Sequence, residues 1–296
     1  MTIEVFENKF KTLVDPAADI TLLQGGFQFT EGPAWDIRNQ WLVFSDIPAN
    51  TKYRYSRAAG VEVYRQPSHF SNGHTIDREG RLVACEHQTR RVTREGKDGV
   101  EVLASTYQGK RLNSPNDVIV ASDGAIIFSD PHYGLMDGLG GPGEQEQPCR
   151  GVYRLPPGAS EPTLLADDFT TPNGLALSKD ERTLYVDDTL CSHLRVFEVA
   201  EDWTLKNGRM FFEFPQNVDP GVPDGMRLDV EGNIFCTGPF GVLVFSPAGV
   251  VLGRINMPEV TANLTWAEAD RRTLFMTASN GLYQLRTLVA GLHAGD

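Results

Sequence analysis

A short apolar run, opened by a residue with a carboxylate or amide side chain, recurs along the chain. The clearest copy is Pro-Asp-Gly-Met-Arg-Leu-Asp at 223–229, and each copy continues through a polar turn into a second apolar run. The six opening residues are Glu31, Asn72, Asn116, Asn173, Asp224 and Asn263. Subtracting their numbers gives spacings of 41, 44, 57, 51 and 39 residues. Self-similarity at roughly 40–50 residues, with about four strands per unit, is typical of a β-propeller.

The end of the last repeat unit indicates how the ring of blades closes. Each unit reads as outer strand, loop, opening residue, inner strand, tight turn, second strand and third strand, with turns such as Ser-Asp-Gly at 122–124. No outer strand follows the last third strand at 282–285, and the outer strand at 20–24 has no unit before it. Pairing these two strands would remove an open sheet edge. We predict an all-β fold, a six-bladed β-propeller of four-stranded antiparallel blades around a central channel, closed by this N-terminal strand.

The repeat also sets the expected domain organisation. Length alone favours two domains, but the repeat continues from near residue 20 to near residue 286 without a change in composition, so we expect one propeller domain over 1–296. Residues 1–18 would form an N-terminal arm. The glycine-rich insertion at 134–150 accounts for most of the longest spacing, and such a loop is a lid or rim, or else disordered.

Composition narrows the classes of partner. The net charge is -12 with a sequence pI of about 5.0, which disfavours nucleic acid and anionic membrane surfaces and favours a cation. No stretch of about 18 apolar residues is present, and the first residues lack the basic start and apolar core of a secretory signal. The four cysteines show no C-x-x-C spacing. We expect a cytoplasmic protein with reduced thiols, monomeric or weakly homo-oligomeric, acting on a small molecule.

Propeller topology would bring the six opening residues together. If every inner strand starts on the same face, its first residue lies at the same mouth of the channel. The second strands return to that face and supply a second tier of polar residues at Asp46, Glu86, His87, Asp130, His132, Tyr133, Asp187, Asp188 and Thr237.

The alternative is that Asn-Gly and Asp-Gly only form turns, which is their commonest use. Three copies weaken that interpretation. Glu31 is a poor turn residue, Asn263 has no glycine after it, and Asn116 is followed by Asp117. The side-chain oxygen recurs where the glycine does not.

A ring of oxygen ligands with two or three carboxylates, and no paired His or Cys, suits a hard cation. Ca²⁺ accepts six to eight oxygen ligands in irregular geometry, whereas Mg²⁺ demands a strict octahedron. Zn²⁺ would call for His or Cys ligands. The residues therefore favour calcium, with manganese or magnesium as alternatives. No nucleophile elbow, phosphate loop or dinucleotide fingerprint is present, so covalent serine chemistry and nucleotide binding have no support.

Four stretches resemble the signature segments of the gluconolactonase, senescence-marker and luciferin-regenerating family of six-bladed propellers. They are Glu-Gly-Pro at 31–33, Asn-Asp at 116–117, Pro-Asn-Gly-Leu at 172–175 and Pro-Asp-Gly-Met at 223–226. The similarity covers nearly the whole chain. It implies a calcium- or zinc-dependent sugar lactonase, a carboxylic ester hydrolase of carbohydrate metabolism.

The resemblance also implies roles for individual residues. Glu31, Asn173 and Asp224 would bind the metal, Asn116 would contact substrate and metal, and Asp224 would donate or accept the proton. Animal members carry an arginine where this chain has Ser114, whereas the Asp-Pro-His-Tyr-Gly segment at 130–134 looks like the bacterial gluconolactonase branch. The sugar hydroxyls would be bound by Asn72, His74, Glu86, Asn116, His132 and Tyr133.

The expected mechanism is hydrolysis of a gluconolactone-like sugar lactone to the aldonic acid. The cation would polarise the carbonyl and Asp224 would assist attack by water. Metal binding lowers the basicity of a carboxylate, so Asp130 or His132 is the alternative base. Two other functions remain open: a calcium-dependent aryl-ester or organophosphate hydrolase using the same site, and a non-catalytic propeller that binds partners and holds a structural calcium.

Overall fold

A six-fold repeat of antiparallel sheets forms the molecule. The computed structural model describes residues 1–97, 99–216 and 221–293. Blade 1 contains β3 (Thr30–Asp36), β4 (Trp41–Asp46), β5 (Thr51–Ser56) and β6 (Gly60–Arg65), and blade 2 contains β7 (Ser71–Ile76), β8 (Leu82–Glu86), β9 (Arg91–Gly96) and β10 (Gly99–Ala104). Blade 3 contains β13 (Val118–Val120), β14 (Ile126–Asp130), β15 (Arg150–Leu155) and β16 (Thr163–Phe169), and blade 4 contains β17 (Pro172–Leu177), β18 (Thr183–Asp188), β19 (His193–Val199) and β20 (Leu205–Glu213). Blade 5 contains β21 (Met226–Leu228), β22 (Ile234–Gly238), β23 (Gly241–Phe245) and β24 (Val251–Asn256), and blade 6 contains β25 (Thr261–Ala267), β26 (Thr273–Ala278), β27 (Gly281–Arg286) and β2 (Ile20–Gly25).

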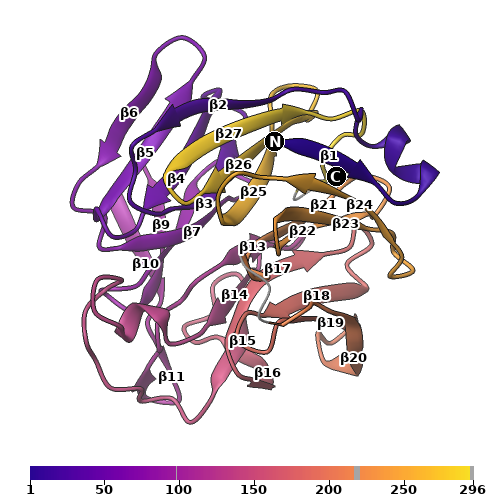
Figure 1. The fold of residues 1–296 in the computed structure, drawn as a ribbon. Helices are drawn as coiled ribbons and strands as arrows, with labels where there is room; N and C mark the ends of the chain where they lie inside the picture. Colours follow the sequence, from indigo (N-terminus) through magenta and orange to yellow (C-terminus); the bar gives the residue numbers. More distant parts are fainter. Residues whose placement is uncertain (98, 217–220, 294–296) are drawn as a thin grey trace.

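The innermost strands form a closed circle. β3 contacts β7, β7 contacts β13, and the series continues through β17, β21 and β25 back to β3. These strands surround the centre in Figure 1, with outer strands such as β6, β10 and β20 at the rim. All inner strands run from the same mouth of the channel, so the predicted six-bladed propeller is confirmed.

The predicted closure by an N-terminal strand is also confirmed. β2 pairs antiparallel with β27, with Ile20 opposite Leu285 and Leu22 opposite Tyr283. The indigo β2 lies beside the yellow β27 in Figure 1. The blade therefore draws on both ends of the chain, and the sheet edge that either strand would leave alone is covered.

The N-terminal arm is more ordered than the sequence indicated. β1 (Thr2–Val5) pairs with β24 and adds a fifth strand to blade 5. A short 3-10 helix, η1 (Asn8–Thr12), follows, and its Phe10 is fully buried. The first residues thus cover the outer edge of blade 5.

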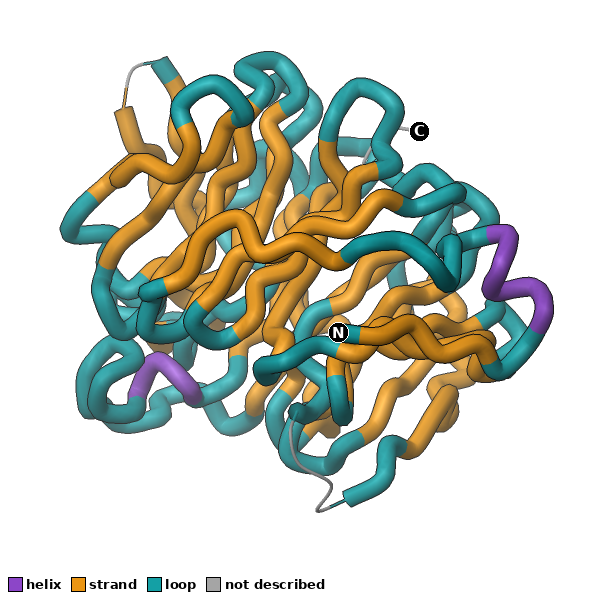
Figure 2. The backbone as a smooth tube through the Cα atoms, turned by 45° about the horizontal axis from the view of Figure 1, so that its top comes forward, coloured by secondary structure: helices purple, strands orange, loops and turns teal. Residues whose placement is uncertain are grey.

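The glycine-rich insertion folds beside the second and third blades. A hairpin of β11 (Thr106–Tyr107) and β12 (Lys110–Arg111) precedes blade 3, and the insertion begins with the 3-10 turn η2 (Tyr133–Leu135). The Gln147 side chain donates hydrogen bonds to the carbonyls of Tyr107, Lys110 and Arg111 and ties the insertion to the hairpin. The two purple helical turns lie at the periphery in Figure 2.

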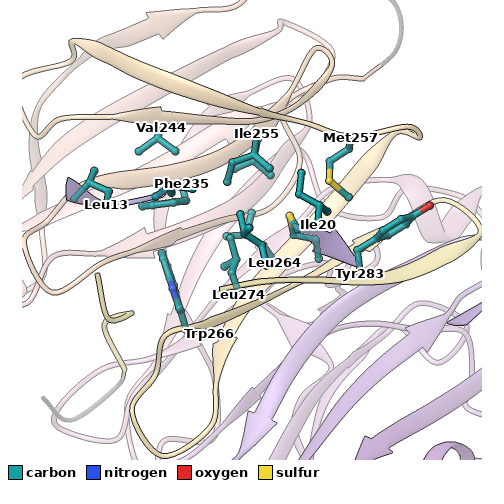
Figure 3. Close-up of a cluster of buried hydrophobic side chains, with 14 of the residues drawn as sticks. Leu13, Ile20, Phe235, Val244, Ile255, Met257, Leu264, Trp266, Leu274 and Tyr283 are labelled. Atoms are coloured by element: carbon teal, nitrogen blue, oxygen red, sulfur yellow. The ribbon is translucent and has the colours of Figure 1, made fainter. Parts of the chain in front are cut away.

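Five apolar clusters lie between neighbouring blades rather than at the centre of the molecule. The largest joins blades 5 and 6, and Figure 3 shows Leu13 and Ile20 from the N-terminal segment in the same cluster as Phe235 and Trp266. Because each blade is buried on both faces, its middle strands are apolar almost throughout. The channel is consequently left to polar side chains.

The contact between blades 1 and 2 contains a buried ion pair. Lys52 Nζ lies 2.9 Å from Glu95 Oε1, and the Tyr64 hydroxyl donates to the same carboxylate at 3.0 Å. Ser45 and Ser71 hydrogen-bond at 2.9 Å across the same contact. A buried charge is tolerated here because it is paired and hydrogen-bonded.

Several residues of the predicted second tier of polar side chains hold loops in place by hydrogen bonds. Asp46, Asp130 and Asp188 each end a second strand, and each carboxylate accepts two backbone N–H groups from the loop before its own inner strand. Thr237 accepts from Asp224 N and Gly225 N in the same way in blade 5. The entry into the inner strands of blades 1, 3 and 4 is therefore stabilised by charge-assisted hydrogen bonds, which are stronger than neutral ones such as those to Thr237.

All four cysteines are unpaired thiols. Among the described residues, no helix is long and apolar enough to cross a membrane.

Candidate functional site

The six opening residues meet at one mouth of the channel. Asn72 Nδ2 donates to Asn116 Oδ1 at 2.7 Å, and Asn116 Nδ2 donates to Asn173 Oδ1. On the other side, Asn263 Nδ2 donates to Glu31 Oε2 at 3.1 Å, and the Asp224 carboxyl group lies beside that of Glu31. Residues far apart in the sequence are therefore neighbours, as the repeat predicted. We call these six residues the ring.

The glycines of the Asn-Gly and Asp-Gly pairs allow the inner strands to approach one another. A Cβ on Gly174 would lie 2.1 Å from the carbonyl oxygen of Asp224 and 2.6 Å from Asp187 Oδ2. A Cβ on Gly73 would lie 2.4 Å from the carbonyl oxygen of Asn116. The glycine after a ring residue is therefore a packing requirement, in addition to any turn preference.

We expect Gly174→Ala to reduce kcat/KM for the lactone substrate by about 100-fold, because a displacement of about 1 Å in a site can have that effect. The added methyl group must push the Asp224 backbone away from its position in the ring. Steady-state kinetics would measure the loss, with circular dichroism as a check on folding. Gly96→Ala is the matched control, since its Cβ would meet only Arg81 Cδ at 3.8 Å. Equal kinetics in both variants would contradict the packing argument.

The ring is strongly acidic and nearly enclosed. Glu31 is 2% exposed, and only Asp224 among the ring residues is not fully buried. Burial, together with the nearby Asp117, raises the pKa of Glu31 to about 7. Burial, followed by Glu31 and Asp187, raises the pKa of Asp224 well above its usual value. Carboxylates crowded in this way require a proton or a cation between them.

Asp187, which the repeat pattern placed in the second tier of polar residues, joins this acidic group. It is fully buried, neither of its carboxylate oxygens has a hydrogen-bond partner in the described part of the chain, and burial followed by Asp117 raises its pKa. The sequence distinguishes Asp187 from its counterparts, because the equivalent position in each of the first three blades has no carboxylate. The equivalent position, just before the last residue of the second strand, is Ser45 in blade 1, Cys85 in blade 2 and Ser129 in blade 3.

A second charged layer lies below the ring. Asp117 is 1% exposed and accepts a hydrogen bond from its neighbour Val118 N at 2.8 Å. Its Oδ2 lies 3.3 Å from Arg227 Nη1, which reaches it from another blade. The sequence contains both residues beside ring positions, but their pairing across the channel could not be read from it.

The ring residues fit a hard cation bound by oxygens. No group of three or more His, Cys, Asp and Glu side chains among the described residues is arranged as a metal site. A cation at this mouth would therefore draw on amide oxygens such as that of Asn173, as Ca²⁺ does and Zn²⁺ rarely does. The oxygens of Asp187 that lack partners in the described part of the chain, and the crowded carboxyl groups of Glu31 and Asp224, are groups that a bound cation would satisfy.

Two residues expected to bind substrate have other contacts. The Glu86 carboxylate accepts hydrogen bonds from Arg91 Nε at 2.8 Å, Thr89 Oγ1 at 2.6 Å and Thr93 Oγ1 at 3.2 Å, all from its own blade. His74 Nδ1 donates to the Gly32 carbonyl at 2.7 Å, and the residue lines a cavity at the opposite mouth. Both expectations are corrected: neither side chain is placed with the ring.

His87 connects the insertion to the ring. Its Nδ1 donates to the Leu139 carbonyl at 2.9 Å, and its Nε2 lies 3.3 Å from Asn116 Oδ1 and 3.4 Å from Asn72 Nδ2. Burial lowers the pKa of His87 to about 4, so its imidazole is neutral and Nε2 is an acceptor. The acceptor faces the Asn72 amide, and the insertion is held against the ring.

His132 and Tyr133 lie at the start of the insertion. Their rings stack with centroids 5.4 Å apart. The Tyr133 hydroxyl lies beside Thr189 and Thr171 without a regular hydrogen bond in the described part of the chain, and burial raises its pKa to about 12, with Asp224 adding to the effect. A neutral phenol is therefore presented near Asp224.

Known proteins with related sequences hydrolyse lactones. The chain is 32% identical to the gluconolactonase of Zymomonas mobilis, covering 98% of this chain and 87% of that protein. The solved structure of the gluconolactonase XC5397 from Xanthomonas campestris is 36% identical and covers 97% of this chain and 95% of that one, with a TM-score of 0.90. A calcium-binding protein, regucalcin from Agrobacterium tumefaciens, has a TM-score of 0.75 at 17% identity, covers 92% of this chain and 95% of that one, and shows the fold alone.

With the fold and the acidic mouth described above, these relatives make the chain a lactonase built on a six-bladed propeller. The family model described as the SMP-30/Gluconolactonase/LRE-like region matches residues 29–280, which span all six ring positions. The chain belongs to this family, and the resemblance noted in the sequence is confirmed.

Proposed function

We propose that the chain hydrolyses a sugar lactone of the gluconolactone type to the aldonic acid at the ring, with a divalent cation, calcium in preference to zinc, manganese or magnesium. The observation that carries the proposal is the enclosed group of Glu31, Asp187 and Asp224, whose raised pKa values indicate an unmet need for positive charge. The gluconolactonase relatives support the substrate class, and the oxygen-only set of side chains at the ring supports the ion.

Glu31, Asn173, Asp224 and Asn116 would hold the cation. When bound, the cation supplies Lewis-acid polarisation of the lactone carbonyl. The protein holds these ligands rigidly, since Asn173 Nδ2 donates to Thr189 Oγ1 at 3.0 Å and Thr189 Oγ1 donates to the Pro223 carbonyl at 2.9 Å. That link fixes Asn173 to the segment carrying Asp224. Preorganisation of this kind avoids reorganisation during the reaction.

Asp224 is the proposed base. It is the most accessible ring residue, and its backbone N–H is fixed by Thr237 Oγ1 at 3.0 Å. Its carboxylate would orient water and take a proton as the water oxygen bonds to the lactone carbonyl carbon. The ester C–O bond of the lactone then breaks, and the departing oxygen takes up a proton to become the hydroxyl group of the aldonate. The alternative base Asp130 is unsuited, because its two oxygens accept the N–H groups of Asn113 and Ser114.

The substrate hydroxyls would be bound by Asn72, Asn116, His132 and Tyr133. Asn72 and Asn116 present amide groups at the mouth, where the Asn72 amide faces the His87 acceptor and donates to Asn116 Oδ1. The Tyr133 hydroxyl has no regular hydrogen-bond partner among the residues that the structure describes and is available to a sugar hydroxyl. A polar site of this kind discriminates strongly against ligands that leave its groups unpaired.

A pH-indicator screen of sugar lactones tests the proposal directly, because ring opening releases acid. The protein is first treated with EDTA, and each lactone is then assayed with and without added Ca²⁺, Zn²⁺, Mn²⁺ and Mg²⁺. We expect turnover of gluconolactone that disappears on chelation and returns best with Ca²⁺. An aryl ester and a phosphotriester serve as comparison substrates. Faster turnover of either, or full lactonase activity in EDTA, would contradict the proposal.

A further inference from the structure

The other mouth of the channel contains a cavity of about 310 Å³, away from the ring. It is lined by the far ends of the inner strands and the tight turns that follow them, including Arg38, His74, Arg78, Lys179 and Arg227. Ring residues stand at the starts of the same strands. The volume is at the lower end of the range of about 300–1,000 Å³ for small-molecule sites. We propose that this cavity is a second binding site and that its ligand is a small hydroxycarboxylate.

Three cationic side chains around the cavity have no carboxylate partner among the described residues. Arg38 donates to the carbonyls of Glu79 and Arg78, and Arg78 donates to the carbonyl of Ser122. Lys179 is exposed and makes no ion pair in the described part of the chain. Two carboxylates also line the cavity, but Asp77 is paired with Arg81 and Glu181 accepts hydrogen bonds from Ser122, so cationic groups outnumber acidic ones there. In a chain of net charge -12, an excess of positive charge around one cavity attracts an anion.

Arg227 adds a positive charge deeper in the cavity. Its side chain is 15% exposed, and its Nη1 is shared between Asp117 Oδ2 at 3.3 Å and its own preceding carbonyl at 2.7 Å. The remaining guanidinium N–H groups are donors, and arginine suits a planar carboxylate well. The negative end of a ligand would therefore meet cationic side chains both at the turns and deeper in the cavity.

His74 supplies the opposite kind of contact. It is fully buried, and its Nδ1 donates to the Gly32 carbonyl, which leaves Nε2 without a partner in the described part of the chain. Burial, with Lys52 adding to the effect, lowers the pKa of His74 to about 3, so Nε2 carries a lone pair at neutral pH. A buried acceptor without a donor is costly, and a ligand hydroxyl would satisfy it.

A ligand that meets both sets of groups combines a carboxylate with a hydroxyl donor. Hydrolysis of a lactone yields a compound of this kind, because ring opening produces a carboxylate and a hydroxyl in one molecule. The aldonate product is therefore the natural probe for the cavity. This choice of probe rests on the proposed function, whereas the existence of the site rests on the contacts just described.

Isothermal titration calorimetry in EDTA would test the site with sodium gluconate as the probe. The decisive variants are Arg78→Glu/Lys179→Glu at the cavity and Glu31→Gln at the ring. Lys110→Glu/Lys206→Glu is the matched control, because both lysines are exposed and the change in net charge is the same. We expect the cavity variant to bind gluconate at least tenfold more weakly, and Glu31→Gln and the control to stay within twofold of the wild type. Sorbitol and propionate, which have only hydroxyls or only a carboxylate, should each bind at least tenfold more weakly than gluconate.

Several results would overturn the inference. One is no gluconate binding by the wild type, and another is binding lost in Glu31→Gln but kept in the cavity variant, which would assign gluconate to the ring alone. Sorbitol or propionate binding as tightly as gluconate would refute the hydroxycarboxylate class. The proposed function is judged separately, by lactone turnover of the same proteins: full turnover in Glu31→Gln would refute that function and leave the cavity result standing.

Discussion

Glu31→Gln and Asp224→Asn are expected to lose at least about 1,000-fold in kcat/KM for a sugar lactone and to lose the bound cation. Each substitution keeps the shape of the side chain and removes one charged ligand from the ring. Polarisation of the carbonyl by the cation lowers the activation free energy by several kcal/mol. Each 1.4 kcal/mol or so of activation free energy is a factor of ten in rate, so its loss corresponds to about three factors of ten. Steady-state kinetics and metal analysis by mass spectrometry would measure the two losses.

Asp36→Asn is the matched control for these variants. Asp36 is a buried carboxylate on β3, the same strand as Glu31, but at its opposite end, where it accepts hydrogen bonds from Arg38 N at 2.9 Å and Asn39 N at 3.0 Å. We expect it to keep its metal and its turnover. If the two ring variants hydrolysed lactone at the wild-type rate without metal, the assignment of the site would be wrong.

Asp187→Asn and Asp188→Asn are expected to have opposite effects on the stability of the metal-free protein. Asp187 is buried near Asp117 and has no hydrogen-bond partner in the described part of the chain, so a neutral amide, which removes the repulsion, should raise the free energy of unfolding by about 1–3 kcal/mol, the usual cost of an unsatisfied buried group. Asp188 accepts hydrogen bonds from Thr170 N, Thr171 N and Cys191 N, so neutralising it should destabilise the protein with or without metal.

Urea denaturation at pH 8 in EDTA and in excess calcium would measure these effects. Calcium at about 1,000 times its Kd should stabilise the wild type by about 4 kcal/mol, and Asp187→Asn should gain less. If Asp187→Asn were less stable than the wild type in EDTA, the carboxylate would have a partner that the structure does not show.

The acidic ring also sets the pH dependence of the metal-free protein. The pKa of Glu31 is raised by burial from its ordinary value of 4.5 to about 7, so the folded chain holds a proton that the unfolded chain releases. The resulting stabilisation is fully present below about pH 4.5 and is lost as the pH rises through about 7. Saturating calcium should reduce this dependence, because the cation takes the place of the proton.

Much of the fold and of the ring could be predicted from the sequence, because a repeat constrains every copy at once. The spacing of the six opening residues fixed the number of blades, and the surplus strand at each end indicated the closure of β2 on β27. Common strand direction then required Glu31, Asn173 and Asp224 to converge. The insertion and the N-terminal arm depart from the repeat, so the pattern could not predict β1 or the contact between Leu139 and His87.

Side-chain partners were decided only by the tertiary structure. Alternation along a strand assigns a residue to a face of the sheet, but the neighbour on that face comes from another blade. Asp187 and Asp188 are adjacent and chemically identical, yet Asp187 lies near the carboxylates of Asp117 and Glu31, whereas Asp188 accepts hydrogen bonds from loop N–H groups. Likewise, Glu86 accepts a hydrogen bond from Arg91, and His74 donates one to the Gly32 carbonyl, so neither side chain contacts the ring side chains. The sequence by itself determined which oxygens line the channel mouth, and the packing of blade against blade decided which of them are left without a partner.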